Sequence, residues 1–275
     1  MNGGEKMEDL MTIAYQKWQN AVDCGDFDQA QKYYRTLKGT EQEPPEVSFV
    51  MGLWQRQNGL FEQALDAFSR ALVVNDRSSA QVLYEMANTY VEMERPHEAA
   101  VLYECSLRLE PEAVEVRFCY GQLLGRLEQK EAAKEQFCHV LQMIDGQDVE
   151  TYINVAVELS ELGLGELAID IYSQALLKEP ENYFLYSNLG VEFAELGDFD
   201  SALFCHQKGL AMNGFAADLW YNLACTYSLM DAVDEGLAAL EKAILLDGDN
   251  KLYAEDDAEL ANLRQDGRFY RLLNI

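Results

Sequence analysis

Basic residues are scarce in this sequence. Its 275 residues include 21 Lys and Arg against 48 Asp and Glu, which gives a formal net charge of -27 at pH 7. A charge of this sign repels phosphate backbones and anionic lipid headgroups. The sequence therefore predicts no nucleic-acid and no membrane partner. The imbalance is steepest over residues 151–250, where 17 acidic residues stand against three lysines, so a neutral to basic protein or peptide partner is expected.

Long apolar runs and paired cysteines are also missing. No run approaches the roughly 20 apolar residues that a membrane-spanning helix needs, and the opening MNGGEKMEDLMTIAY has acidic residues where a signal peptide would have its apolar core. The six cysteines form no CxxC pair, so neither a disulfide framework nor a zinc site is expected. These features predict a cytoplasmic protein with reduced thiols.

Motifs of catalysis are absent as well. The sequence has no glycine-rich phosphate loop and no nucleophile motif. Glu158 and Glu161 lie one helical turn apart and could do acid–base work or hold a cation, but the same pair recurs 34 residues later, which is typical of repeated surface residues. Each of the two Cys-His dipeptides supplies at most two metal ligands. We predict that the chain is not an enzyme and binds no cofactor and no metal.

The sequence does contain a repeat. A small residue is followed after four positions by an aromatic or other large residue and after seven by another small or apolar residue. The triads are Ala30, Tyr34, Leu37; Ala64, Phe68, Ala71; Ala99, Tyr103, Ser106; Ala133, Phe137, Val140; Ala168, Tyr172, Ala175; Ala202, His206, Gly209; and Gly236, Leu240, Ala243. Their first members are 34 or 35 residues apart, and such a period indicates a repeat architecture.

Each period contains the signals of two short helices. Twelve residues before six of the seven triads lies another small residue, where two amphipathic helices can approach closely. These residues are Gly52, Ala87, Gly121, Ala156, Gly190 and Ala224. Between the two predicted helices, four glycines occupy the point where a helix ends in a left-handed residue; they are Gly25, Gly59, Gly163 and Gly197. Pro111 and Pro180 follow second helices and prevent their continuation.

This pattern resembles the tetratricopeptide repeat, a helix-turn-helix unit of 34 residues with small residues at positions 8, 20 and 27. The resemblance implies an all-α fold, a right-handed α-solenoid of about seven units with a C-terminal capping helix. The expected units span residues 11–44, 45–78, 80–113, 114–147, 149–182, 183–216 and 217–250, after an N-terminal extension at 1–10. Three units depart from the pattern. Trp18 occupies a small position, so the first pair is either splayed or a cap; His206 replaces an aromatic in the sixth unit; and the seventh unit has Gly236 at position 20.

Residues 251–275 do not continue the period. Their leucines and Phe269 are expected to cover the apolar face that the last repeat exposes. The segment also resembles the closing motif that follows tetratricopeptide arrays in many bacterial proteins, which suggests a bacterial source. The residues that carry this likeness are Asp257, Leu263, Arg264, Asp266, Arg268 and Phe269.

The resemblance implies that the first helices of such a solenoid line a concave groove. The side chains expected there form an apolar and aromatic strip with asparagines and two arginines, which suits a peptide or an amphipathic helix. They are Tyr15, Phe49, Leu53, Arg56, Tyr84, Asn88, Phe118, Gln122, Arg126, Asn154, Asn188, Asn222 and Tyr221. An alternative is that neighbouring repeats bury part of this strip as framework.

The column Asn154, Asn188 and Asn222 could hold a peptide backbone, because an amide both donates and accepts. The lysines that grip a chaperone C-terminus in some members of the family are absent, so no such carboxylate clamp is expected. We predict a non-catalytic scaffold that binds a protein partner in the groove. The alternative is a structural module that assembles into homo-oligomers.

Overall fold

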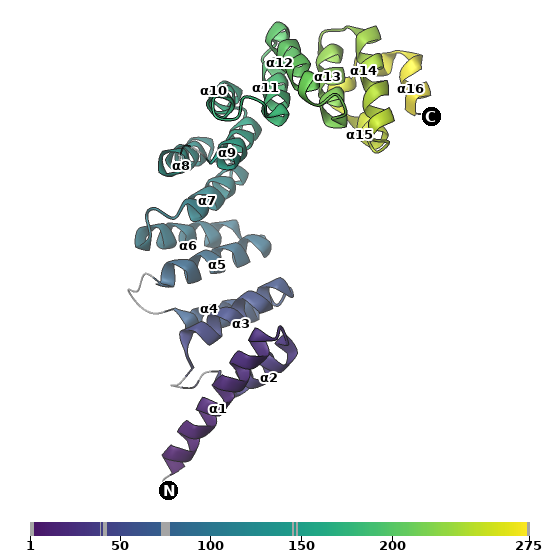
Figure 1. Cartoon of the computed structure of the whole chain (residues 1–275). Coiled ribbons are helices and arrows are strands. Elements are labelled where there is room, and N and C mark those ends of the chain that lie inside the picture. The colour runs from purple at the N-terminus through teal and green to yellow at the C-terminus, as the bar shows by residue number, and fades with distance from the viewer. Residues whose placement is uncertain are drawn as a thin grey trace. The chain divides into compact units, whose positions relative to one another are not determined.

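The computed structural model describes residues 3–38, 40, 43–72, 78–144, 146 and 148–273, and in that part of the chain it contains helices and turns but no strand (Figure 1). Seven helix pairs follow one another in these residues. They are α1 (Gly3–Asp23) with α2 (Phe27–Leu37), α3 (Pro45–Gln57) with α4 (Phe61–Ala71), α5 (Ser78–Glu92) with α6 (Pro96–Leu109), α7 (Val114–Arg126) with α8 (Lys130–Met143), α9 (Val149–Glu161) with α10 (Gly165–Leu176), α11 (Tyr183–Glu195) with α12 (Phe199–Met212), and α13 (Ala217–Leu229) with α14 (Val233–Leu246).

After the last pair come α15 (Asn250–Asp256), two 3-10 helices, η1 (Ala258–Leu260) and η2 (Leu263–Gln265), and α16 (Gly267–Leu273). The predicted all-helical repeat fold with a C-terminal cap is confirmed. The cap consists of several short elements where the sequence suggested one helix. At the other end, α1 begins at Gly3, so it includes residues that we had expected to form an extension before the repeats. None of the described helices combines the length and the apolar character that a bilayer-spanning segment needs.

The turn inside every pair contains one residue in the left-handed backbone conformation. These residues are Gly25, Gly59, Glu94, Glu128, Gly163, Gly197 and Asp231, and they are 34 or 35 residues apart, like the triads. The backbone N–H of each donates to the carbonyl three residues earlier, for example from Gly25 to Val22 at 2.9 Å and from Glu94 to Val91 at 3.0 Å. The turn geometry is therefore the same whether or not the residue is glycine.

Several first and second helices begin after a residue whose side chain accepts a hydrogen bond from a backbone N–H of the first turn. Asp26 accepts a hydrogen bond from the backbone N–H of Gln29, and Asp198 accepts one from Ser201. Both residues belong to the sequence Gly-Asp-Phe-Asp, which occurs in the first and the sixth pair. A carboxylate at this position satisfies one of the N–H groups that a helix start leaves unpaired. The repeated motif therefore has a structural role in ending one helix and starting the next.

The small residues of the first helices make room for large side chains of the second helices. A Cβ atom on Gly121 would stand 2.8 Å from Cε1 of Phe137, and one on Gly190 would clash with the ring of His206. The sequence had suggested that small residues of both helices meet at the crossing. In these repeats the glycine instead accommodates a ring of the second helix, because a flat ring fills the space that an absent side chain leaves.

The first pair departs from this pattern, as its sequence indicated. Trp18 takes the place of the small residue, yet it is buried, in a cluster with Tyr34 and Met51. The helices α1 and α2 nevertheless pack directly on each other, as in the other pairs. The first pair therefore closes around a tryptophan instead of a glycine or alanine.

The chain divides into two compact units, Met1–Met143 and Ile144–Ile275, here called unit 1 and unit 2. Within unit 2, Leu260, Leu263 and Phe269 of the cap are fully buried in one cluster with Leu237 and Leu240 of α14. The sequence prediction that the tail covers the last repeat is confirmed, and this cover keeps the apolar end of the helix array out of water.

Candidate functional site

Unit 1 contains a cleft of about 280 Å³ on the face formed by the first helices α3, α5 and α7. Its lining consists of Arg56, Tyr84, Asn88, Val91, Glu92, Tyr103, Cys119, Gln122, Leu123 and Arg126. Five of these were predicted from the sequence as groove residues, namely Arg56, Tyr84, Asn88, Gln122 and Arg126. We refer to this cavity as the first-helix cleft.

Helical spacing brings the lining residues together. Tyr84, Asn88 and Val91 of α5 are four and three residues apart, so they lie along one face of that helix. Gln122 and Arg126 of α7 are likewise four residues apart. Residues of both faces line the same cleft.

Arg56 is held in place by two carboxylates of α5. Its Nη2 lies 3.0 Å from Oε2 of Glu85, and its Nη1 lies 2.7 Å from Oε1 of Glu92. Glu85 is buried, and this burial raises the pKa of its carboxyl above the usual value, while Arg56 opposes the shift. The charge of Arg56 is thus largely neutralised inside the protein.

Two tyrosine hydroxyls are engaged in the wall of the cleft. The hydroxyl of Tyr84 donates to Oε1 of Glu115 at 2.8 Å and lies 3.5 Å from Sγ of Cys119. The hydroxyl of Tyr103 donates to Oδ1 of Asn88 at 2.5 Å. Burial raises the pKa of both tyrosines well above the usual value. Both phenols therefore stay neutral at physiological pH and orient the groups beside them.

Arg126 differs from Arg56. Its side chain is exposed, and it has no hydrogen bond or ion pair with any residue in the part of the chain that the structure describes. The cleft lining therefore contains one cationic group that has no ion pair with a described residue, together with the amides of Asn88 and Gln122 and the apolar side chain of Leu123. The net charge of the chain is -27, so this cationic group has the opposite sign to most of the charged residues.

The other predicted residues of unit 1 lie outside this cleft. They are Tyr15, Phe49, Leu53 and Phe118, all half-buried. The ring of Phe49 lies 5.9 Å from that of Phe68, and the ring of Phe118 lies 5.6 Å from that of Phe137, centroid to centroid. Each pair joins a first helix to the second helix of the same repeat. These aromatic side chains are thus partly used as framework.

The three asparagines of the predicted column, Asn154, Asn188 and Asn222, belong to unit 2, and two of them are engaged within it. Asn222 donates from Nδ2 to Oγ of Ser187 in the preceding repeat at 3.0 Å, and Asn188 hydrogen-bonds to Tyr172. Asn154 is exposed. An amide with an internal partner retains fewer donor and acceptor positions for a peptide, so Asn154 is the most available of the column.

Tyr221, the last predicted groove residue, is engaged by the cap. Its hydroxyl donates to Oδ2 of Asp257 at 2.7 Å, and the buried Sγ of Cys225 lies 3.8 Å from the same oxygen. Burial raises the pKa of Tyr221, of Cys225 and of the nearby Glu259. No group of three or more His, Cys, Asp or Glu side chains in the described residues is placed to hold a metal ion.

Sequence reasoning missed half of the cleft lining, for two reasons. Cys119, Val91 and Glu92 occupy repeat positions 6, 12 and 13, which lie on the same helix face as the predicted residues; a stricter use of the repeat register would have found them. Tyr103 comes from the second helix α6, and no rule about first helices indicates it.

The described residues form an all-helical repeat fold with a cleft on the first helices of unit 1. Residues 15–81 and 217–250 match family models of the tetratricopeptide repeat. No curated protein is detectably similar to the chain in sequence. The chain therefore contains tetratricopeptide repeats, and proteins built from this repeat generally serve as non-catalytic scaffolds for protein–protein interactions.

Several solved structures share the fold at low sequence identity. A tetratricopeptide repeat protein from Parabacteroides merdae is 19% identical with a TM-score of 0.58, and the match covers 94% of this chain and 99% of that one. YrrB, described as a tetratricopeptide repeat protein with an unusual peptide-binding site, is 20% identical with a TM-score of 0.52, over 74% of this chain and all 100% of its own. MamA is 18% identical with a TM-score of 0.53, over 63% and 93%.

Proposed function

We propose that this protein is a non-catalytic cytoplasmic scaffold whose first-helix cleft binds a peptide or helix of a partner protein. The proposal is carried by the guanidinium of Arg126, which is exposed and has no ion pair with any described residue. A cationic group beside two amides and an apolar wall suits a peptide segment that offers an acceptor and an apolar side chain. YrrB, which has the same fold, is described as having a peptide-binding site, and this supports peptide binding as the type of function.

The cleft favours one chemistry in its ligand. An aspartate or glutamate side chain would pair with Arg126, and a neighbouring apolar side chain would contact Leu123 and Val91. Arg56 is already neutralised by Glu85 and Glu92, so a second acidic group gains little there. The rest of the partner would be neutral to basic, because the surrounding protein is strongly acidic.

Selection from a random 12-residue peptide phage library tests this function. Wild-type protein is expected to enrich peptides with an Asp or Glu next to apolar residues. Selected peptides should lose at least about tenfold in affinity for the Arg126→Glu variant, because the attraction between Arg126 and the acidic side chain of the peptide is replaced by repulsion. Arg35→Glu changes charge equally at an exposed arginine of α2, outside the cleft, and is the matched control.

The proposal fails if the selected peptides bind Arg126→Glu as tightly as wild type while circular dichroism shows both proteins folded. The alternative of homo-oligomeric assembly is examined by light scattering across a range of protein concentrations. A monomer at every concentration excludes assembly as the main function. All six cysteines are free thiols, which is consistent with the proposed location in the reducing cytoplasm.

A further inference from the structure

Exposed large apolar side chains are unevenly distributed over the described residues. Unit 1 has two of them, Ile13 and Val101, whereas unit 2 has twelve. Half of the latter lie at the turns that join one pair to the next, or at their flanks. These are Leu177, Phe184, Met212, Phe215, Leu245 and Leu252, which we call the apolar edge. Leu177 is 85% exposed and Phe215 is 83% exposed, so neither is part of the core.

The three turns of the apolar edge lie on the same side of unit 2. Gly209, close to the end of α12, lies beside the backbone oxygen of Tyr183 at the start of α11 and beside Leu219 near the start of α13. The α10–α11 and α12–α13 turns are therefore neighbours. The helices α13 and α14 are packed as the next pair, so the α14–α15 turn continues the row by the same antiparallel alternation.

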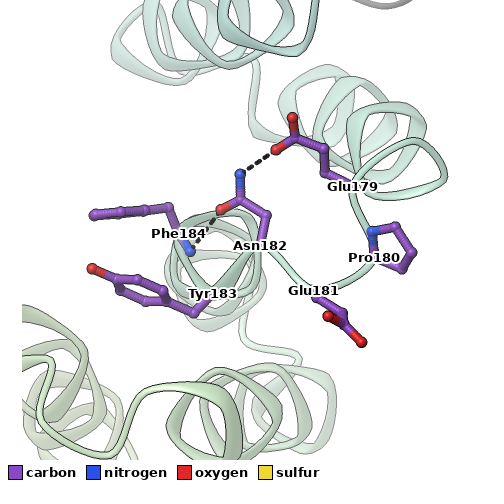
Figure 2. Close-up of a pocket in the computed structure, with 6 residues that line it drawn as sticks. All are labelled: Glu179, Pro180, Glu181, Asn182, Tyr183 and Phe184. Atoms are coloured by element: carbon purple, nitrogen blue, oxygen red, sulfur yellow. Dashed lines mark hydrogen bonds between the residues drawn. The ribbon is translucent and has the colours of Figure 1, made fainter.

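The first of these turns is also a surface hollow, of about 600 Å³, formed by residues 179–184. Figure 2 shows the rings of Tyr183 and Phe184 on one side of Asn182, with Glu179 and Glu181 on the other. The two rings stack at 4.1 Å between centroids. Glu179 accepts a hydrogen bond from the Asn182 side chain at 2.7 Å. The ring faces can stabilise a lysine or arginine side chain, and the carboxylates on the other side of Asn182 can stabilise a further cationic group by charge.

Acidic residues accompany the whole apolar edge. The turns carry Glu179, Glu181, Asp218, Asp247 and Asp249, and none of the five forms an ion pair with a described residue. Unit 2 as a whole has 25 acidic and 7 basic residues, a net charge of -18, against 23 and 14, a net charge of -9, in unit 1. This field repels a second copy of the chain and an anionic membrane, and it attracts a cationic partner.

We propose that the apolar edge of unit 2 is a docking surface for a basic amphipathic segment of a partner protein. The partner's apolar side chains would cover Phe184, Phe215 and their neighbours, and its lysines and arginines would pair with the turn carboxylates. Exposed apolar patches of this kind on a soluble chain mark contact sites. The surface is separate from the first-helix cleft, and this inference does not rest on the function proposed for that cleft.

A pair of designed peptides tests the proposal on the full chain. The probe is a fluorescein-labelled amphipathic helix of leucine and lysine, and its counterpart has glutamate in place of every lysine. By fluorescence anisotropy, the lysine probe is expected to bind, and to bind more weakly at 300 mM than at 50 mM salt, as a charge-assisted contact must. The glutamate peptide is expected not to bind.

Three variants locate the contact. Phe184→Ser with Phe215→Ser is expected to weaken the lysine probe by about tenfold, the typical effect of truncating interface aromatics. Val101→Ser removes an exposed apolar side chain from α6 of unit 1 and should leave affinity unchanged. The double variant Glu179→Gln with Glu181→Gln should reduce the salt dependence of the affinity for the lysine probe. Both substituted pairs are exposed, so the variants should fold, and circular dichroism checks this.

Three results would overturn the inference. The first is equal affinity of the lysine probe for wild type and for the double serine variant. The second is equal binding of the glutamate peptide, which would show that charge has no part in the contact. The third is a wild-type dimer in light scattering that becomes a monomer in the double serine variant, because a second copy would then be the occupant.

Discussion

The ring of Phe68 on α4 lies directly over Gly52 on α3, so that a Cβ atom at Gly52 would stand 2.5 Å from Cε1 of that ring. Both residues are fully buried. The glycine is therefore required by space, since its backbone is ordinary helix. The same relationship links Gly121 with Phe137 in the fourth pair, and it explains why a glycine survives in the middle of a helix despite its low helix propensity.

We expect Gly52→Ala to destabilise the protein by about 1–3 kcal/mol, because overpacking the contact with Phe68 outweighs the better helix propensity of alanine. Urea unfolding followed by circular dichroism measures the change. Adding Phe68→Leu should recover part of the loss, so that the double variant is more stable than the two single changes predict. Strict additivity, or a stabilised Gly52→Ala, would show that the ring is not the limiting contact.

Three turns hold a non-glycine residue in the left-handed conformation, and we predict that two of them can be improved. Glu94→Gly and Glu128→Gly should each stabilise the protein by about 0.5–1 kcal/mol. The left-handed conformation costs a residue with a side chain about 1–2 kcal/mol, and part of the gain is lost because glycine increases the conformational entropy of the unfolded chain. Thermal unfolding measures both variants.

The matched control is Gly59→Ala, at the equivalent turn of the second pair with φ of 71°. This change should destabilise the chain by about 1 kcal/mol or more, since alanine is strained at positive φ. A stabilising effect of Gly59→Ala, or a loss in both glutamate variants, would contradict the turn argument.

His206 predicts a pH dependence of stability. It is fully buried, and its Nε2 lies 2.9 Å from Oγ1 of Thr226, which itself donates to the carbonyl of Asn222 at 3.0 Å. The neutral ring therefore donates from Nε2, and Nδ1 is buried with no hydrogen-bond partner in the described structure. A proton on Nδ1 would be an unpaired buried charge, and burial lowers the pKa of His206 from 6.5 to about 4.

Because the folded pKa lies below the unfolded one, the unfolded chain binds the extra proton between these values. Stability is unaffected by His206 above pH 6.5, and it should fall by up to about 3 kcal/mol as pH drops from 6.5 to 4. His206→Phe should remove the loss of stability that His206 causes at acidic pH, and the ring should fit because Phe68 and Phe137 occupy the same position opposite a glycine. His139→Gln, at a half-buried histidine of α8, should keep the wild-type profile. Urea midpoints from pH 7 to pH 5 distinguish these outcomes.

The cap supplies a fourth prediction. Leu263 is fully buried against Gly236 and the last pair, so Leu263→Ala should cost about 2–4 kcal/mol through lost burial and a residual cavity. Leu252→Ala, at a residue that is 72% exposed, should change stability by less than about 0.5 kcal/mol. Urea unfolding measures both. Equal, small effects would mean that the tail contributes little to the stability of the last repeat.

Much of the fold could be predicted because its signals are local. The period of 34 or 35 residues, the small residue of each first helix and the turn glycines are visible in sequence, since helix faces repeat every 3.6 residues and a tight turn needs a left-handed residue. The candidate site was partly accessible for the same reason. Arg56, Tyr84, Asn88, Gln122 and Arg126 were found from the face of the first helix on which they lie.

The sequence alone therefore determined the repeat, the helix pairs and the helix face that lines the first-helix cleft, because each depends on residues that are close along the chain. Only the tertiary structure decided which polar groups remain available. It gave Asn222 a partner in Ser187, placed Tyr103 in the cleft from a second helix, and left Arg126 with no ion pair among the described residues. Hydrogen-bond partners across repeats depend on distances of a few tenths of an ångström between helices, and no local pattern in a sequence specifies those.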